Sequence, residues 1–309
     1  MKLNRFISLL LISILVVMMS FFVGCSKEGN SKKIIFVMQQ KENGDFFNSL
    51  NDNLEKTLTE SGYSYENLCP EQWGANYQSK VIEEAIESKP EAILLAPVIG
   101  NQLYGAIEKA NKANIPIILL DTNLDRELLA AARISVSTFI GIDNYKGGKM
   151  VADKVSEGLE KGSKVAIVGG GVTAFNGEER CKGFEDEIKS KGMNVVGKTT
   201  TDWSDTEGYQ RGKLILTVNP DVKLVFTANS SILKGFMKAA NELGITSIKG
   251  ATFEKDSITD EYMKNGILLC TYDQNIKGIS KTVYDVIKKI ESGEKLEEVT
   301  NSEGILCTK

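Results

Sequence analysis

The side chains that could do chemistry in this chain are carboxylates, amides, an arginine and aromatic rings, because none of its 309 residues is histidine. The absence of histidine excludes Ser-His-Asp and Cys-His catalysis and every zinc site built on imidazole. Aromatic rings can cover the apolar C–H faces of a sugar, and planar polar groups can satisfy its hydroxyls in pairs. Such residues follow strand-like runs at Phe46, Phe47, Asp121, Arg180, Trp203, Asn229, Glu254 and Gln274. This set therefore favours a sugar site over a phosphate site, which needs glycine-rich loops at helix starts.

The elements that must position these residues are short strands alternating with amphipathic stretches. Candidate strands are KIIFVM (33–38), AILLAP (92–97), IPIILLD (115–121), KVAIVG (164–169), KLVFTA (223–228) and ILLCTY (267–272). Consecutive apolar residues are typical of strands buried on both faces of a parallel sheet. Helical windows lie at 76–88, 101–113, 144–160, 206–217 and 274–291. The alternation predicts an α/β fold with doubly wound parallel sheets, whose ligands bind beyond the carboxyl ends of the strands.

An internal repeat indicates that this plan occurs twice. Landmarks separated by 130 residues are Gly62 and Gly192, Pro90 and Pro220, and Asn114 and Gly244. The offset predicts two similar lobes of about 110–130 residues, which would face each other across a cleft. We expect Gly62, Gly192 and Gly244 to end helices in the left-handed conformation.

The N-terminus has the pattern of an export signal. Lys2 and Arg5 precede an apolar run over 6–23, and no acidic residue occurs before Glu28. Residues 1–24 are therefore predicted to be a signal peptide. The sequence FVGC (22–25) resembles a bacterial lipobox, so Cys25 is the expected lipid attachment site and 25–32 a lipidated tether on the outer face of the cell membrane. The alternative is an uncleaved anchor, because this run of 18 residues, broken only by Ser8, Ser13 and Ser20, could just span a bilayer.

Charge and cysteine usage exclude further classes of protein. A net charge of −4 gives no electrostatic footprint for nucleic acid. Cys69, Cys181, Cys270 and Cys307 are scattered, so neither a disulfide framework nor metal spacing can be read from them. We expect most of them to be buried as small apolar residues, and we expect no metal and no cofactor.

Several motifs, taken in order, resemble the type I periplasmic binding proteins for sugars, nearest to the ribose- and galactose-binding receptors of ABC transporters. The resemblance runs from about residue 33 to the C-terminus. The motifs are DFF (45–47), the strand ending in Asp121, GIDNYKGGKMVAD (141–153), RCKGF (180–184), NPD (219–221), TANSS (227–231) and YDQ (272–274).

The resemblance implies roles for the candidate residues. Phe46 and Phe47, preceded by Asp45, would stack on one sugar face and Trp203 on the other. Asp121 would accept hydrogen bonds from hydroxyls, and Arg180 would donate them. Asn229 and Gln274 would bridge neighbouring hydroxyls, and Glu254 falls where the family usually has Asp.

Departures from the family pattern bear on the ligand. Thr122 stands where ribose binders carry Arg, Ser230 stands where Asp often follows the Asn, and Gly44 replaces a polar residue. These differences argue against ribose itself. The Asp-rich calcium loop of some galactose binders is not visible either, which again predicts no metal.

The family topology implies three chain crossings, near 141–143, 273–274 and 300–303. The N-terminal lobe would then comprise 33–142 and 274–302, and the C-terminal lobe 143–273 and 303–309. The implied function is capture of a small sugar by a monomeric receptor that closes by a hinge and delivers its ligand to an ABC permease. Without histidine, we expect the affinity to be insensitive to pH near neutrality.

Other functions and simpler roles stay open at this point. The same fold could serve a membrane sensor kinase or a chemoreceptor, and Asp121 with Glu254 could act as the acid and base of a glycoside-acting enzyme. A repressor of this fold would need a helix-turn-helix where this chain has its signal.

Several site residues also have a simpler structural explanation. Phe46 or Phe47 could pack inward, Trp203 could be core, and Asp121 could cap a helix. Arg180 could pair with Glu178 or Glu179 at the surface. The GGGV run (169–172) could bind phosphate, although it lacks the Lys-Ser/Thr of a P-loop.

Overall fold

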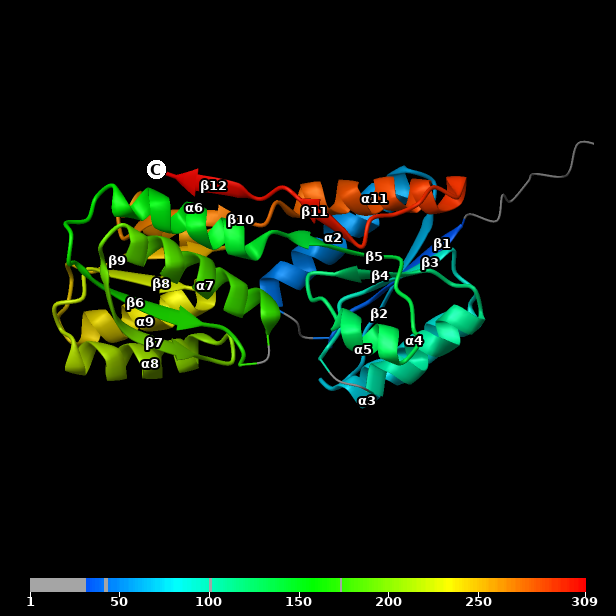
Figure 1. Ribbon diagram of the computed structural model, residues 1–309, viewed down its shortest axis with the longest axis horizontal. Coiled ribbons are helices and arrows are strands. Elements are labelled where there is room, and N and C mark those ends of the chain that lie inside the picture. The colour runs from blue at the N-terminus through cyan, green and yellow to red at the C-terminus, as the bar shows by residue number, and fades with distance from the viewer. Residues whose placement is uncertain (1–31, 42–43, 100–101, 173) are drawn as a thin grey trace, which may run out of the picture.

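Two six-stranded sheets form the framework of the protein, one in each half of the molecule (Figure 1). The computed structural model describes residues 32–41, 44–99, 102–172 and 174–309. The first sheet contains β1 (Lys33–Val37), β2 (Ser64–Leu68), β3 (Ala92–Leu95), β4 (Ile117–Leu120), β5 (Thr138–Ile142) and β11 (Val299–Ser302). The second contains β6 (Lys164–Gly169), β7 (Asn194–Thr200), β8 (Leu224–Thr227), β9 (Lys249–Phe253), β10 (Leu268–Asp273) and β12 (Ile305–Thr308).

The two sheets have the same strand order. It is β11-β5-β4-β3-β1-β2 in the first half and β12-β10-β9-β8-β6-β7 in the second. Among the described strands every pairing is parallel except that of β10 with the edge strand β12. The predicted fold class, two similar doubly wound parallel-sheet lobes, is confirmed.

Helices cover both faces of each sheet, which explains the continuous apolar runs. The helices are α2 (Gly44–Glu60), α3 (Ala75–Glu87), α4 (Gln102–Lys112), α5 (Arg126–Ala131), α6 (Asn144–Ser156), α7 (Phe175–Ser190), α8 (Asp205–Val218), α9 (Ser230–Glu242), α10 (Ser257–Lys264) and α11 (Ile276–Ser292). In β1, Ile35 and Val37 join one core cluster with residues of α3 and α4. Ile34 and Phe36 join another with residues of α2 and α11. Successive side chains of a strand point to opposite faces, so each face needs its own apolar residues.

The repeat landmarks have matching backbone geometry in the two halves. Gly62 and Gly192 end α2 and α7 with φ of 88° and 87°. Asn114 and Gly244 follow α4 and α9 with φ of 57° and 69°. These left-handed conformations end the helices as predicted, and Asn is the side chain that tolerates the conformation best after Gly.

The chain passes between the two sheets three times, along one side of the molecule (Figure 1). The passages lead from β5 to α6, from β10 to α11, and from β11 to β12. Asp143 caps α6, and Asn275 caps α11 and donates to the Glu303 carbonyl over 2.9 Å. The edge strands on the other side are β2 and β7.

The four described cysteines form no disulfide. Cys181 and Cys270 are buried, and burial raises the pKa of each thiol to about 12. Cys69 and Cys307 are half-buried. Cys181 and Cys270 therefore act as small apolar residues rather than as nucleophiles, whereas the expectation that most of the four would be buried is met by these two alone.

The predicted signal peptide (1–24), Cys25 and the tether up to residue 31 lie outside the described residues. Within the described part of the chain, no helix has both the length and the apolar character needed to cross a bilayer.

Candidate functional site

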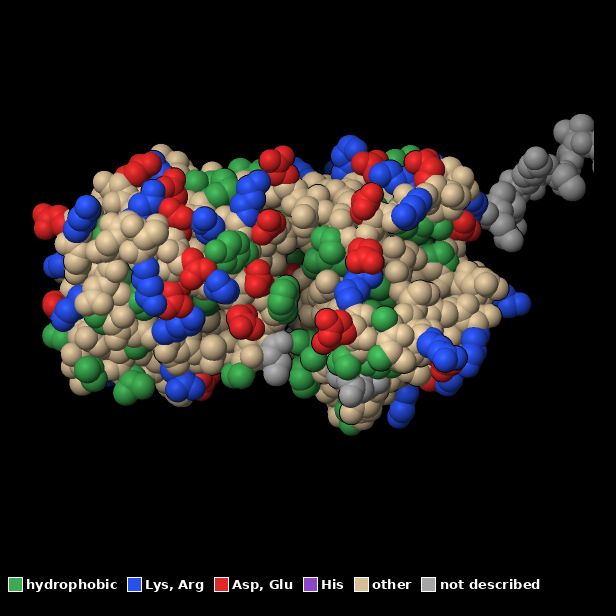
Figure 2. All heavy atoms as spheres, in the orientation of Figure 1, with side chains coloured by type: hydrophobic (Ala, Val, Ile, Leu, Met, Phe, Trp, Pro, Cys, Tyr) green, Lys and Arg blue, Asp and Glu red, His purple; other side chains and the backbone are tan. Residues whose placement is uncertain are grey.

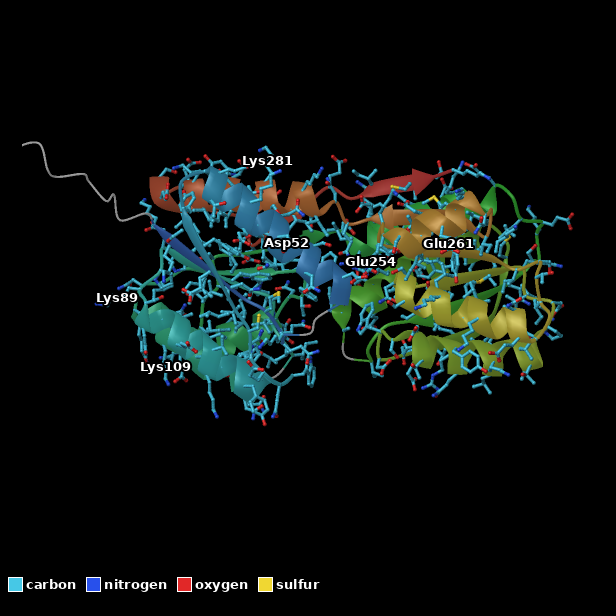
Figure 3. All side chains as sticks on the ribbon, turned by 180° about the vertical axis from the view of Figure 1, so that it is seen from behind. Asp52, Lys89, Lys109, Glu254, Glu261 and Lys281 are labelled. Atoms are coloured by element: carbon cyan, nitrogen blue, oxygen red, sulfur yellow. The ribbon has the colours of Figure 1, made fainter. Side chains whose placement is uncertain are left out.

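A cavity of about 680 Å³ lies where the two halves face each other. Figure 3 shows one of its carboxylates, Glu254, at the middle of the molecule, where the two halves meet. All nine residues predicted for the site line this cavity: Asp45, Phe46, Phe47, Asp121, Arg180, Trp203, Asn229, Glu254 and Gln274. The carboxyl ends of the strands of both sheets point toward it, which is where an open parallel sheet places its ligands.

Asp121 follows β4 in a left-handed conformation, with φ of 62°. Its Oδ2 accepts hydrogen bonds from Thr122 Oγ1 at 3.0 Å and from Asn176 Nδ2 at 3.3 Å. Its Oδ1 accepts none from the described residues, so it is available to a ligand in the cavity. Burial raises the pKa of Asp121, and the nearby charge of Arg180 opposes that effect. Asp125, not Asp121, caps the next helix, so the capping alternative for Asp121 is wrong.

Arg180 is only 2% exposed, although it carries a charge. Its Nε donates to Asn144 Oδ1 over 2.8 Å, and its Nη1 donates to the carbonyl of Ala228 over 3.0 Å. The guanidinium also lies 4.6 Å from the centre of the Phe253 ring, a cation–π distance. These contacts fix the plane of the group, and its burial rules out the alternative of a surface salt bridge.

Glu254 occupies in the second half the place that Asp121 occupies in the first. Asp121 directly follows β4 and Glu254 directly follows β9, and these strands hold the same position in the spatial order of their sheets. Glu254 is also in the left-handed conformation, with φ of 77°. Ser230 Oγ donates to Glu254 Oε2 over 3.1 Å. Burial raises the pKa of Glu254 to about 7, while the charge of Arg180 lowers it. Asp121 and Glu254, one from each half, therefore both lie close enough to Arg180 for its charge to act on them.

The raised pKa of Glu254 argues against the expectation that affinity is insensitive to pH near neutrality. That expectation rested only on the absence of histidine. A glutamate whose pKa lies near 7 changes charge in the same range as an unperturbed histidine. Burial, which no sequence motif reveals, is the main cause.

Trp203 is seated on glycines, among them Gly170 and Gly177. A Cβ at Gly170 would come within 2.2 Å of the indole, and one at Gly177 within 2.9 Å. The Trp203 ring thus lines the cavity and also packs on the core of the second half. Gly170 and Gly171 of the GGGV run therefore allow close approach of this ring, and this packing explains them without a bound phosphate.

Asn229 holds the Trp203 segment in place. Its Oδ1 accepts from the Ile232 backbone N–H as the cap of α9, and its Nδ2 donates to the Trp203 carbonyl over 3.2 Å. Much of its hydrogen-bonding capacity is therefore used within the protein. Gln274 differs, because its side chain is 4% exposed and bonds to no described residue. Its amide is free for a ligand.

Phe46 and Phe47 lie in the first turn of α2, with ring centres 5.2 Å apart in an edge-to-face arrangement. Both rings line the cavity and both also pack against the core of the first half. Phe46 and Phe47 therefore pack inward and line the cavity at the same time. Asp45, beside them, is exposed at the cavity edge.

Several residues of the site were not predicted. Asn176 lies one helical turn before Arg180 on α7, a spacing that could have identified it. Trp73 also lines the cavity. Gln78 is fully buried and donates to the carbonyls of Met38 and Ala96, so it fixes the loops after β1 and β3. No sequence signal marks a glutamine in an amphipathic helix as such a support.

Comparisons with known proteins agree with this geometry. A family model described as a periplasmic binding protein domain matches residues 34–295. The chain is 27% identical over 246 residues to the D-ribose/D-allose-binding protein of Pseudomonas aeruginosa, covering 78% of this chain and 76% of the relative. It is 27% identical over 279 residues to the ribose import binding protein of Bacillus subtilis, covering 90% and 88%.

A solved structure shows the same relationship. The crystal structure of an ABC transporter periplasmic solute binding protein from Actinobacillus succinogenes, with bound D-allose, has a TM-score of 0.84 at 25% identity. It covers 90% of this chain and 98% of that chain. These relatives are named as binding proteins, which confirms the expectation that the chain is not an enzyme. With a match over most of its length, the chain belongs to the periplasmic binding protein family.

Proposed function

We propose that this protein is the sugar-binding component of an ABC import system and takes a neutral monosaccharide in the cavity between its halves. The observation that carries the proposal is the composition of the cavity wall. Carboxylates and a fixed guanidinium lie beside aromatic rings, and both halves contribute. The names of the relatives, which refer to ribose, allose and import, support the same function.

The ligand would be recognised by hydrogen bonds of fixed geometry. Asp121 and Glu254 accept from hydroxyls, and Arg180 donates to hydroxyl or ring oxygens. Phe46 and Trp203 cover the apolar faces. Among the described residues that line the cavity, six are acidic and two, Arg180 and Lys255, are basic, which disfavours anionic sugars such as sugar phosphates. A ligand lacking one hydroxyl would leave a buried polar group unpaired and bind far more weakly.

Closure of the two halves around the ligand would follow from the topology. We assign the N-terminal lobe to 33–142 and 274–302, and the C-terminal lobe to 143–273 and 303–309. The three passages between them are short and lie on one side of the molecule, which suits a hinge. The ligand itself bridges the lobes, so it stabilises the closed form.

The export and delivery steps complete the proposal. The lipid on Cys25 would hold the receptor at the outer face of the membrane, beside the permease. Metabolic labelling with a palmitate analogue tests this, and label should enter the wild-type protein but not Cys25→Ser. Labelling that survives the substitution would contradict the lipid assignment.

Isothermal titration with a panel of neutral aldoses tests the function itself. The panel should contain D-allose, D-ribose and D-galactose, with D-ribose 5-phosphate as the anionic control. We expect one sugar to bind at one-to-one stoichiometry and to be recovered unchanged. Turnover of the sugar or of a glycoside, or tighter binding of the phosphate, would contradict the proposal.

A further inference from the structure

The two tryptophans of the chain occupy equivalent places in its two halves. Trp73 and Trp203 are 130 residues apart, the same offset that separates the other repeat landmarks. Trp73 lies between β2 and α3, and Trp203 lies between β7 and α8. Both residues line the same cavity.

Their position places them at the open side of the cavity. β2 and β7 are the edge strands farthest from the three passages between the sheets, which involve β5, β10, β11 and β12. In Figure 1 the passages run along the top, whereas α3 and α8 lie at the bottom of the two halves. A hinge at the passages would therefore move the segments of Trp73 and Trp203 more than any residue close to the hinge.

The two indoles differ in how they are held. Trp203 is packed against glycines and its carbonyl is bonded by Asn229. Trp73 is 62% exposed, one of the most exposed large apolar side chains in the described part of the protein. Because so much of its indole is exposed beside the cavity, Trp73 can contact a ligand that binds there.

Other apolar side chains lie exposed on both sides of the opening. Ile99, which lines the cavity from the first half, is 47% exposed. In the second half, Val172 and Phe175 directly follow the cavity-lining residues Gly171 and Ala174 in the sequence, and they are 82% and 58% exposed. Figure 2 shows apolar side chains on both sides of the furrow between the halves. Closing the furrow would remove such surface from water.

We propose that Trp73 is the second indole of the ligand site and, together with Phe46, covers the sugar from the first half, opposite Trp203, when the cleft closes. The inference rests on the proposed function and adds a contact residue to it. Trp203 then supplies a fixed apolar wall, and Trp73 supplies a wall that moves. Substitution of Trp73 would affect the closed, sugar-bound form and leave the fold of the free protein unchanged.

Affinity measurements give the first test. We expect Trp73→Ala to weaken binding of the best panel sugar by about tenfold, with an unchanged melting temperature of the free protein. Leu214→Ala is the matched control, because Leu214 is also 62% exposed but does not line the cavity. The control should bind like the wild type. Binding by Trp73→Ala within twofold of the wild type would overturn the inference.

Fluorescence gives a second test, because the chain has only two tryptophans. Subtracting the spectrum of Trp73→Phe from that of the wild type isolates the emission of Trp73. With saturating sugar this emission should shift to the blue and become less accessible to acrylamide. Unchanged emission, in a wild type that binds sugar by calorimetry, would overturn the inference and leave the proposed function standing. A wild type that binds no sugar would overturn both.

Discussion

Asn176 Nδ2 lies 3.3 Å from Asp121 Oδ2, so a side chain of the second half donates to the carboxylate at the end of β4 in the first. Asn176 lies on α7 one turn before Arg180, and the charge of Arg180 also acts on Asp121. One helix of the second half therefore presents two donors to the cavity, next to a carboxylate from the other half. Asp121 therefore accepts a hydrogen bond that links the two halves beside the cavity.

The first prediction is that Asp121→Asn weakens sugar binding by at least tenfold, because an amide oxygen is a poorer acceptor for hydroxyls than a carboxylate. Asn tolerates the left-handed backbone of this position, so the fold should persist. Asp121 is only partly buried, and loss of its charge also removes a partner of Arg180, so the melting temperature should change little. Calorimetry and thermal unfolding measure the two effects.

Asp125→Asn is the matched control for that substitution. Asp125 caps α5 outside the cavity, and Asn caps helices about as well as Asp does. The control should bind sugar like the wild type. Equal affinities for the two variants would contradict the role given to Asp121.

The second prediction concerns stability and Glu254. The pKa of Glu254 is raised from 4.5 to about 7 in the folded protein, so the folded state binds more protons than the unfolded state between these values. Its contribution to stability is therefore lost as pH rises through that range. Glu254→Gln should raise the free energy of unfolding at pH 8 by roughly 1–3 kcal/mol and change it little at pH 5. Urea unfolding at both pH values checks this, and a gain equal at both would contradict it.

The third prediction concerns the pH dependence of affinity. Hydroxyls donate more strongly to the carboxylate than to the protonated form, so sugar binding should tighten from pH 6 to pH 8. Glu254→Gln should flatten this dependence, since the amide does not titrate. Calorimetry in buffers matched for ionic strength measures both proteins. A wild-type affinity that is constant over this range would show that Glu254 is not an acceptor for the ligand.

The fourth prediction concerns the seat of Trp203. A methyl group at Gly170 would collide with the indole, so Gly170→Ala should displace the ring and weaken sugar binding by about tenfold or more. Gly105→Ala is the control, because a Cβ at this helical position of α4 meets no other atom within 4 Å. The control should bind normally and be slightly more stable, by about 0.5–1 kcal/mol. Normal binding by Gly170→Ala would contradict the role of the glycine seat.

The sequence predicts those strands that are buried on both faces of a sheet. β3 and β4 have every residue buried, and both appear in the sequence as unbroken apolar runs. β2 has the sequence SYENL, lies at a sheet edge and is half-buried throughout, so it has no such run. β11 and β12 are also edge strands with exposed residues, and their pairing depends on chain segments distant in sequence.

The sequence predicted residues of the cavity wall where motifs carry them, as at Asp121 and Arg180. The support given by Gln78, the cap formed by Asn229 and the raised pKa of Glu254 could not be read in this way. Each depends on which groups the tertiary structure places nearby and how far it excludes water. Single-residue patterns do not contain that information.

A crystal structure of the protein with the tightest-binding sugar of the panel is the decisive test of sugar binding between the two halves. We expect one sugar molecule in the cavity, with hydroxyl oxygens within about 3.2 Å of both the Asp121 carboxylate and the Arg180 guanidinium. Atoms of both halves should contact the same molecule. A sugar bound outside the cavity, or held by one half alone, would show that the two halves do not form the binding site together.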